Sequence, residues 1–319
     1  MTDAFACADA CREAGESPIG MAATHERYVL VECPPPWPYQ APQAKPVPDA
    51  LRALIDELKG TVRFLFVHSE AHKQPGASRV LFLRRPAGRA RVYHKSEATV
   101  RDLSEVAPLV RAYLAGESLP QLQDSQATRD ILVCTHGTHD KCCGRYGNPF
   151  YQQACQIAAD RQDVRLWQSS HFGGHRFAPT AIDFPDGRHY GFLDGEAFAA
   201  ILARSGDIRY LDRVYRGWGL LPGPLQFLEK ELALRHGWDW FGYAVAGWVL
   251  SQNADGSHQT LELAYEAPDG TLSGYRAEAV LDESQTVCIY GACNHEAPSR
   301  FPKFAIRNCT AVQPASAAT

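Results

Sequence analysis

The sequence predicts an α/β protein in which two copies of one folding unit are followed by an α+β extension. Three observations predict this organisation. Two consecutive stretches show strands and helices in the same order, and their equivalent elements lie roughly a hundred residues apart. After Tyr210 the pattern changes. The 319 residues are enough for two or three domains.

The second copy, between Ile131 and Gly206, shows the order most clearly. Asn148 and Pro149 suit the start of its first helix, and Asp194 suits the N-cap of its second. The expected strands are ILVCT, VRLWQ, TAIDF and RHYGF, and the expected helices are NPFYQQACQIAAD and GEAFAAILAR. The order of one strand, a helix, three strands and a helix is that of a thioredoxin-like unit.

The first copy and the tail complete the division into domains. The first copy has the expected strands YVLVE, VRFLFVH, RVLFLRR and ARVYH and the expected helices PDALRALIDELKG and TVRDLSEVAPLVRAYLAG. In the tail, LQFLEKELALRHG predicts a helix, and HQTLELAYEA, LSGYRAEAVL and QTVCIYG predict strands. We therefore expect two tandem thioredoxin-like domains, residues 1–122 and 123–210, and a C-terminal α+β extension, residues 211–319.

Composition and charge exclude several classes of function. The formal net charge is -4 and no long block of like charge occurs, so neither nucleic acid nor an anionic membrane surface is an expected partner. The start of the chain does not read as a signal peptide, and the longest apolar stretch, 241–250, is about half of what a membrane span needs. We therefore expect a soluble cytoplasmic protein. In that setting, ten cysteines favour metal or redox chemistry over a disulfide framework.

The segment CTHGTHDKCC, followed downstream by HFGGH, carries the strongest chemical signal. Cys134 and Cys143 have eight residues between them, and His171 and His175 have three. Both pairs lie in loops that leave the same end of neighbouring strands, so four donors can converge. Two thiolates and two imidazoles suit either zinc or an iron–sulfur cluster.

Two features favour a [2Fe–2S] cluster over zinc. Gly173 and Gly174 let the backbone approach a cluster, and the tight C-x2-C pairs of many structural zinc sites are missing. Neutral imidazoles in place of two thiolates make a cluster easier to reduce, as in Rieske centres. The remaining ring N–H of each histidine can lose a proton on oxidation, so we expect electron transfer to depend on pH.

Several neighbouring residues have two interpretations. His136 and His139 either form hydrogen bonds to the ligands or are solvated loop residues, and we favour solvated residues. Arg176 either stabilises the reduced centre or is a solvated charge. Cys142 directly precedes Cys143 and is an alternative ligand.

Cysteines outside the motif have simpler interpretations. Cys33, His68 and His72 occupy the equivalent places of the first copy, which lacks a counterpart of Cys143, so we interpret them as a degenerate site. Cys7 and Cys11 have helical spacing and are interpreted as buried structural residues, with pairing to Cys293 or His295 as the alternative.

The C-x8-C and H-x-G-G-H motifs resemble the sucrase/ferredoxin-like family, a branch of the thioredoxin-like ferredoxins. The N-terminal stretch from Cys7 through SPIGMAA to VLVECPPPWPY also resembles that family, so the similarity covers most of residues 1–200. The resemblance implies a [2Fe–2S] cluster held by Cys134, Cys143, His171 and His175.

The sequence therefore predicts an electron-transfer or redox protein with an unidentified redox partner protein. We favour an electron carrier over a catalyst with its own substrate, and a monomer in which the internal repeat replaces a homodimer. The first alternative is a zinc-binding structural or interaction module. The second, a thiol–disulfide enzyme, is disfavoured because the chain has no C-x-x-C motif.

Overall fold

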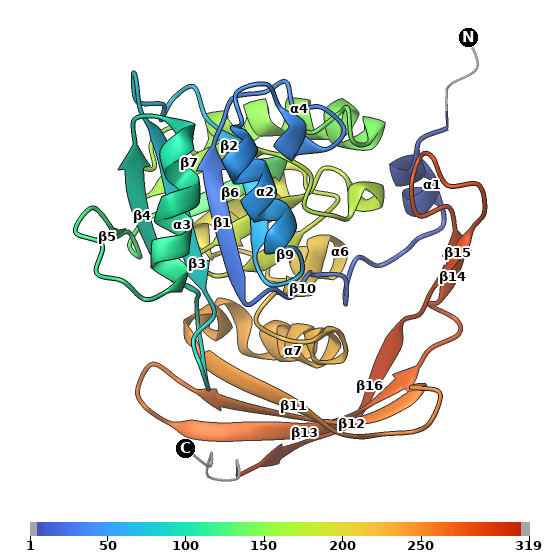
Figure 1. Cartoon of the computed structure of the whole chain (residues 1–319). Coiled ribbons are helices and arrows are strands. Elements are labelled where there is room, and N and C mark those ends of the chain that lie inside the picture. Colours follow the sequence, from blue (N-terminus) through green and yellow to red (C-terminus); the bar gives the residue numbers. More distant parts are fainter. Residues whose placement is uncertain (1–4, 314–319) are drawn as a thin grey trace.

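A computed structural model describes residues 5–313 and contains one large mixed sheet (Figure 1). Within these residues the sheet has ten strands in the order β10-β9-β8-β6-β7-β2-β1-β3-β4-β5. The strands are β1 (Arg27–Glu32), β2 (Arg63–His68), β3 (Ser78–Arg84), β4 (His94–Val100), β5 (Gln123–Asp124), β6 (Arg129–Cys134), β7 (Val164–Ser169), β8 (Ala181–Phe184), β9 (Arg188–Tyr190) and β10 (Tyr215–Trp218).

The two halves of this sheet show the same strand pairing. In the first half β1 is parallel to β2 and antiparallel to β3, which pairs with β4. In the second half β6 is parallel to β7 and antiparallel to β8, which pairs with β9. The halves join edge to edge, because β2 and β7 pair antiparallel through Val67↔Ser169 and His68↔Gln168. The mixed α/β class is thus confirmed, whereas the domain boundaries at 122 and 210 stay a prediction.

Helices cover both halves of the sheet. The first half carries α2 (Asp49–Glu57) and α3 (Val106–Leu114), and the second half carries α4 (Lys141–Ile157), α5 (Gly195–Ala203) and α6 (Tyr210–Val214). Asp194 caps α5 as predicted, accepting a hydrogen bond from the backbone N–H of Ala197 at 2.9 Å.

Three predicted boundaries are wrong. The strand expected over residues 90–94 begins only at His94, as β4. The helix expected from Thr99 begins at Val106, because residues 94–100 form strand β4 and the side chain of Asp102 caps the short 3₁₀ turn that leads into α3. The helix expected from Asn148 begins at Lys141, because Asp140 caps it earlier and Pro149 lies inside it.

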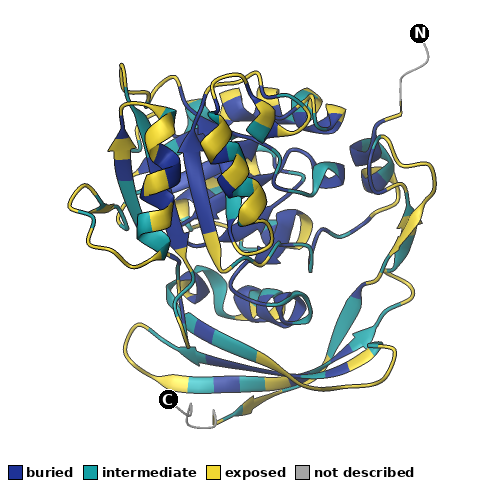
Figure 2. Ribbon diagram, in the orientation of Figure 1, coloured by how far each residue is buried: buried dark blue, intermediate teal, exposed yellow. Residues whose placement is uncertain are grey.

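The C-terminal part adds a helix and two small sheets. Helix α7 (Gly223–His236) lies between the large sheet and a four-stranded antiparallel sheet (Figure 1). That sheet has the order β11 (Ala244–Gln252), β12 (His258–Glu266), β13 (Leu272–Leu281) and β16 (Phe304–Val312), and β14 (Val287–Ile289) pairs with β15 (Ser299–Phe301). One hydrophobic core joins Leu30 of β1, Leu132 of β6 and Leu263 of β12. The central strands of the large sheet are accordingly mostly dark, buried ribbons in Figure 2, whereas its edge strands β4 and β5 are partly or fully exposed.

The N-terminal helix α1 (Cys7–Glu13) lies beside the β14–β15 segment, although the two are almost 300 residues apart in sequence (Figure 1). Both segments flank the loop after β7. In the described part of the chain, no helix combines the length and apolar character that crossing a membrane requires.

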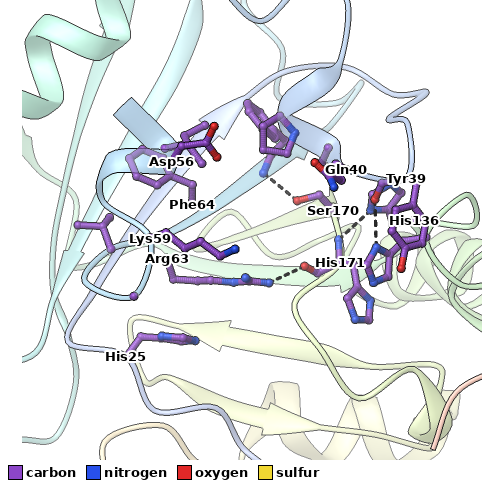
Figure 3. Close-up of a pocket in the computed structure, with 17 residues that line it drawn as sticks. His25, Tyr39, Gln40, Asp56, Lys59, Arg63, Phe64, His136, Ser170 and His171 are labelled. Atoms are coloured by element: carbon purple, nitrogen blue, oxygen red, sulfur yellow. Dashed lines mark hydrogen bonds between the residues drawn. The ribbon is translucent and has the colours of Figure 1, made fainter. Parts of the chain in front are cut away.

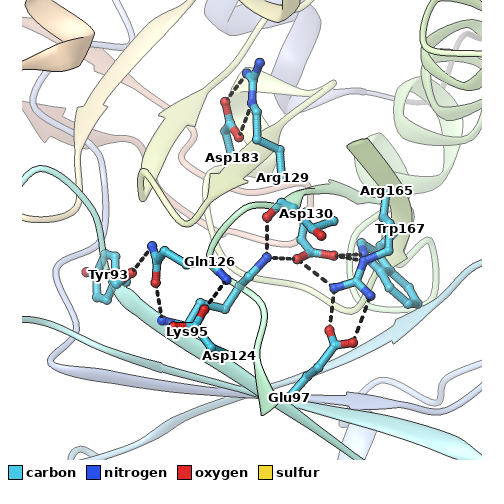
Figure 4. Close-up of polar contacts among 11 residues, drawn as sticks. Tyr93, Lys95, Glu97, Asp124, Gln126, Arg129, Asp130, Arg165, Trp167 and Asp183 are labelled. Carbon is cyan, nitrogen blue, oxygen red and sulfur yellow. Dashed lines mark hydrogen bonds and ion pairs between the residues drawn. The ribbon is translucent and has the colours of Figure 1, made fainter. Parts of the chain in front are cut away.

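The interior of the large sheet contains a charged network (Figure 4). Asp130 on β6 accepts hydrogen bonds from Lys95 Nζ at 2.5 Å, Arg165 Nε at 2.7 Å and Trp167 Nε1 at 2.8 Å. Arg165 also pairs with Glu97 at 2.6 Å. The network ties β4, β6 and β7 together.

Candidate metal centre

The two predicted cysteine ligands meet where β6 ends and α4 begins. Cys134 is the last residue of β6, and Cys143 lies in the first turn of α4. Gly147 makes this approach possible, because a Cβ there would lie only 2.0 Å from the carbonyl oxygen of Cys134. Helix α4 therefore packs directly against the end of the strand.

His171, in the loop after β7, completes a compact group with the two thiols. Its Nδ1 lies 3.8 Å from Cys134 Sγ and 3.6 Å from Cys143 Sγ. The three donor atoms all lie within 4.8 Å of one another. Two sulfurs and one imidazole nitrogen at this spacing can share an inorganic centre.

The fourth predicted ligand, His175, lies beside this group. Its ring stacks on that of His171 with centroids 5.1 Å apart. Its Nε2 forms a hydrogen bond of 2.8 Å with the carbonyl oxygen of Gly291, which assigns the ring proton to Nε2. Its Nδ1 is buried and has no hydrogen-bond partner among the described residues. A buried lone pair without a donor is what a metal ligand presents before the metal binds.

The structure separates the two adjacent cysteines. The thiol of Cys143 lies by His171, whereas the thiol of Cys142 lies 3.6 Å from Cys7 Sγ and 3.4 Å from Cys293 Sγ. Because consecutive helical residues point in different directions, the alternative of Cys142 as the ligand beside Cys134 does not fit this geometry.

Burial keeps both histidines neutral. It lowers the pKa of His171 to about 2, helped by the neighbouring rings of His139 and His175. Burial also lowers the pKa of His175, although Asp140 opposes that effect. A neutral imidazole can offer its lone pair to a metal at physiological pH.

The two thiols of the site differ in acidity. Burial opposes ionisation of Cys134, but hydrogen bonds from Cys143 and from the backbone N–H groups of His136 and Phe172 hold its pKa below the usual value. The hydrogen bond to Cys134, together with burial, raises the pKa of Cys143. Cys134 is therefore the more acidic of the two thiols and the one that more readily forms the thiolate that binds metal.

The glycines between the histidines contribute in different ways. Gly173 and Gly174 both have positive φ, +96° and +85°. A Cβ on Gly174 would lie 2.4 Å from the guanidinium carbon of Arg216, whereas one on Gly173 would meet open space. Gly174 thus permits close packing of a buried cation under the loop.

Arg176 is neither solvated nor directed at the centre. It is buried and forms two hydrogen bonds to Glu16, of 2.9 and 3.0 Å. Arg176 shares this carboxylate with Lys303, and because it is buried its interpretation as a solvated loop charge is wrong. The cations nearest the site are instead Arg216, whose Nη1 donates to Gly173 O at 3.1 Å, and Arg63, whose Nη2 donates to His171 O at 2.7 Å.

His136 and His139 both contact His171. The backbone N–H of His171 donates to Nδ1 of His136 at 3.1 Å, and His136 Nε2 contacts the carbonyl of Pro38 at 2.8 Å. The ring of His139 stacks on that of His171 with centroids 4.0 Å apart. His136 is only 3 % exposed, so its interpretation as a solvated residue is wrong. Together they fix the position of His171.

A cavity of about 480 Å³ opens beside His171 (Figure 3). The charged side chains that line it are Lys59, Arg63 and Asp56, and Tyr39, His136 and His139 line it near the site. His171 therefore lies between the buried sulfurs and an open cavity.

The corresponding residues of the first half do not converge. Cys33 is buried in the core of that half, and His68 Nε2 pairs with Glu70 at 3.0 Å. His72 packs against Trp167 with ring centroids 6.1 Å apart. Within residues 5–313, these three side chains do not form a metal-binding group.

Four residues that shape the site were not predicted from the sequence: Asp140, Gly291, Arg63 and Arg216. Asp140 carried a signal, since an Asp before a helical stretch is a preferred N-cap. The others come from distant segments and lack any local pattern that marks them.

Comparison with known proteins agrees with the motif. The model of the family described as sucrase/ferredoxin-like matches residues 18–217. This range begins before β1 and ends in β10, so it contains Cys134, Cys143, His171 and His175 but neither α1 nor the C-terminal sheets. Neither the curated proteins nor the solved structures gave a match.

Proposed function

Since the chain belongs to the sucrase/ferredoxin-like family, we propose that it is an electron-transfer protein whose [2Fe–2S] cluster is held by Cys134, Cys143, His171 and His175. One observation carries the proposal. Two thiols and an imidazole nitrogen converge within 4.8 Å, and a second imidazole beside them has a buried ring nitrogen without a partner. We also propose that the two halves of the large sheet are thioredoxin-like units.

The donor set suits a cluster with one cysteine-bound and one histidine-bound iron. A [2Fe–2S] cluster supplies exchange of a single electron. Cys134 and Cys143 supply the negative charge, and the two imidazoles bind without adding any. Such ligation lifts reduction potentials to about -150 to +300 mV, compared with about -400 mV for plant-type clusters held by four cysteines.

The chain orients His175 through its backbone. The bond from Nε2–H to the Gly291 carbonyl fixes the tautomer and leaves Nδ1 as the ligating atom. The stack on His171 holds the two rings side by side. Both imidazoles are thus positioned before iron binds.

Arg63 and Arg216 take the role that the sequence suggested for Arg176. Arg216 is only 3 % exposed, and its guanidinium donates to the backbone of the glycine loop. Burial, helped by the charge of Arg176, lowers the pKa of Arg216 to about 10, and the neighbouring Cys134 and Cys143 partly oppose this shift. A buried cation near the sulfurs stabilises the reduced, more negative centre.

The open cavity supports exchange with a partner. His171 reaches from the sulfurs to the cavity wall, so electrons need not cross the core of the protein. Lys59 and Arg63 outnumber the single carboxylate of Asp56 on the cavity wall, which suits an acidic redox partner protein whose approach would be sensitive to salt.

Metal analysis of protein purified without oxygen tests the proposal. We expect two iron and two sulfide per chain, a red-brown colour and visible charge-transfer bands that are lost in Cys134→Ser and retained in Cys288→Ser. Colourless protein with zinc bound by Cys134, Cys143 and His171 would support a zinc module instead and overturn the electron-transfer proposal.

A ligand exchange tests the role of His175. His175→Cys should retain a cluster with a more negative reduction potential, because a thiolate adds charge to the iron. His258→Cys, at an exposed position in β12, is the matched control and should leave the potential unchanged. An unchanged potential in His175→Cys, measured by protein-film voltammetry, would count against the proposed ligation.

A further inference from the structure

A second group of metal-ligating side chains lies on the other side of the first turn of α4. Cys7 of α1, Cys142 of α4 and Cys293 after β14 bring their sulfurs to within 3.4–3.6 Å of one another, and a carboxylate oxygen of Asp140 lies within 4.8 Å of them. The three cysteines are unbridged, and Cys7 and Cys142 are fully buried.

The spacing of the three sulfurs fits a tetrahedral ion. With Zn–S bonds of about 2.3 Å, ligand sulfurs around zinc lie about 3.8 Å apart. A disulfide would instead need two of the sulfurs at about 2.05 Å and would leave the third thiol unpaired. We propose that Cys7, Cys142 and Cys293, with Asp140 as the fourth ligand, bind a structural Zn²⁺ ion.

Asp140 is positioned to complete the site. Its Oδ1 caps α4 by accepting the backbone N–H of Cys142 at 2.8 Å. Its Oδ2 accepts the backbone N–H of Cys293 at 3.3 Å and lies 4.0 Å from His175 Nδ1. One oxygen therefore caps helix α4, and the other points to the place where the three segments that carry the thiols meet.

The surroundings favour a thiolate-bound soft ion. Ala6, Ala8 and Ala178 pack around Cys7 and Cys142, so water is largely kept from the sulfurs. Cys142 also lies in the first turn of the 17-residue helix α4, where the positive end of the helix dipole stabilises a thiolate. Three sulfur donors select zinc over the hard cations Mg²⁺ and Ca²⁺.

This site would fasten helix α1 and the segment between β14 and β15 to the first centre. Cys7 and Cys293 are 286 residues apart in sequence, and Cys142 directly precedes the proposed cluster ligand Cys143. Cys293 lies two residues after Gly291, whose carbonyl orients His175. The zinc ion would hold that carbonyl in place, which is a structural role independent of whether the first centre is a cluster.

Metal counting on full-length variants tests the proposal. Wild type should contain about one zinc per chain, and Cys293→Ser should lose most of it while iron is retained. Cys288→Ser, a neighbouring exposed cysteine, is the matched control and should keep its zinc. Cys134→Ser should lose iron but keep zinc. Wild type without zinc, or Cys293→Ser with full zinc, would overturn the assignment.

Spectroscopy on the wild type gives a second readout that needs no variant. X-ray absorption at the zinc edge should show three sulfur neighbours near 2.3 Å and one oxygen near 2.0 Å. An imidazole nitrogen among the neighbours would place the zinc at the first centre. A Cys7–Cys293 disulfide in non-reducing peptide mapping would show that the thiols pair with each other. Either result rejects the zinc site.

Discussion

At the scale of single residues, Asp130 shows how a buried charge is kept ionised. Its side chain has no exposed surface, yet Lys95, Arg165 and Trp167 all donate to it. Asp130→Asn removes one of two carboxylates and leaves only Glu97 to balance the buried cations Lys95 and Arg165, so we expect a loss of about 3–5 kcal/mol in the free energy of unfolding at pH 7. Urea denaturation followed by circular dichroism measures it.

The same residue predicts a pH dependence. Burial alone would raise the Asp130 pKa, but the charges of Lys95 and Arg165 bring it below the usual value. Its stabilising contribution is therefore present above about pH 4, the pKa in the unfolded chain, and is lost as pH falls through the lower folded pKa. The difference in the free energy of unfolding between wild type and Asp130→Asn should therefore become smaller as the pH falls below about 4.

A surface ion pair provides the control for Asp130. Asp163 pairs with Arg161 at 2.7 Å, but half of its side chain is exposed. Asp163→Asn should cost no more than about 1 kcal/mol at pH 7. Two outcomes would contradict the role given to the buried network. One is an equal loss of unfolding free energy in Asp130→Asn and Asp163→Asn. The other is a difference between wild type and Asp130→Asn that does not change with pH.

The sequence predicted those site residues that successive strands and helices bring together. Cys134 ends β6, Cys143 lies at the start of the helix that follows it, and His171 follows the neighbouring parallel strand β7, so their proximity follows from the order of the elements. Arg216 and Gly291 reach the site only through tertiary packing from remote segments. No local sequence pattern distinguishes them from other arginines and glycines of the chain.

At the scale of elements, helix α4 begins earlier than its local sequence signals predict, because a cap and tertiary packing extend it. Asn148 and Pro149 have the residue types of a helix start, but the helix already begins at Lys141. The Asp140 cap and the contact of Gly147 with the end of β6 extend it. Only this longer helix places Cys143 in a first turn and sends Cys142 toward Cys7.

Gly147→Ala tests that contact. Helix propensity alone predicts that alanine stabilises a helix by about 1 kcal/mol. At this position, however, the new Cβ would lie 2.0 Å from a backbone oxygen, so α4 must move away from β6. We expect a net loss of about 1–3 kcal/mol, as for overpacked cores, and a lower iron content because Cys143 moves with the helix.

Thermal denaturation and iron analysis measure the two effects of Gly147→Ala. Gln156→Ala, at an exposed position of the same helix, is the control and should change stability by less than about 0.5 kcal/mol. A Gly147→Ala protein more stable than wild type and fully loaded with iron would show that the close approach is unimportant.

At the scale of the whole molecule, the two repeats are joined more closely than tandem domains need to be. The pairing of β2 with β7 makes their strands one sheet, and one core continues from it through α7 into the C-terminal sheet. The repeat itself was visible as a sequence pattern. The joining of its copies was not, because edge pairing between strands a hundred residues apart leaves no periodic signal.

A continuous core predicts that distant parts unfold together. Leu263 of β12 is fully buried in the core that also contains Leu132 of β6. Leu263→Ala should lower the global free energy of unfolding by about 2–5 kcal/mol. If the core is one cooperative unit, hydrogen exchange should show the same decrease in the opening free energy of the β6 amides, although β6 carries no substitution.

Val249→Ala, at a 38 % exposed position in β11, is the control. It should change the global free energy of unfolding and the opening free energy of the β6 amides by less than about 0.5 kcal/mol each. Unaltered protection of β6 in Leu263→Ala would mean that the C-terminal sheet unfolds separately, and that the candidate centre depends on it only through the contacts of Gly291 and Cys293.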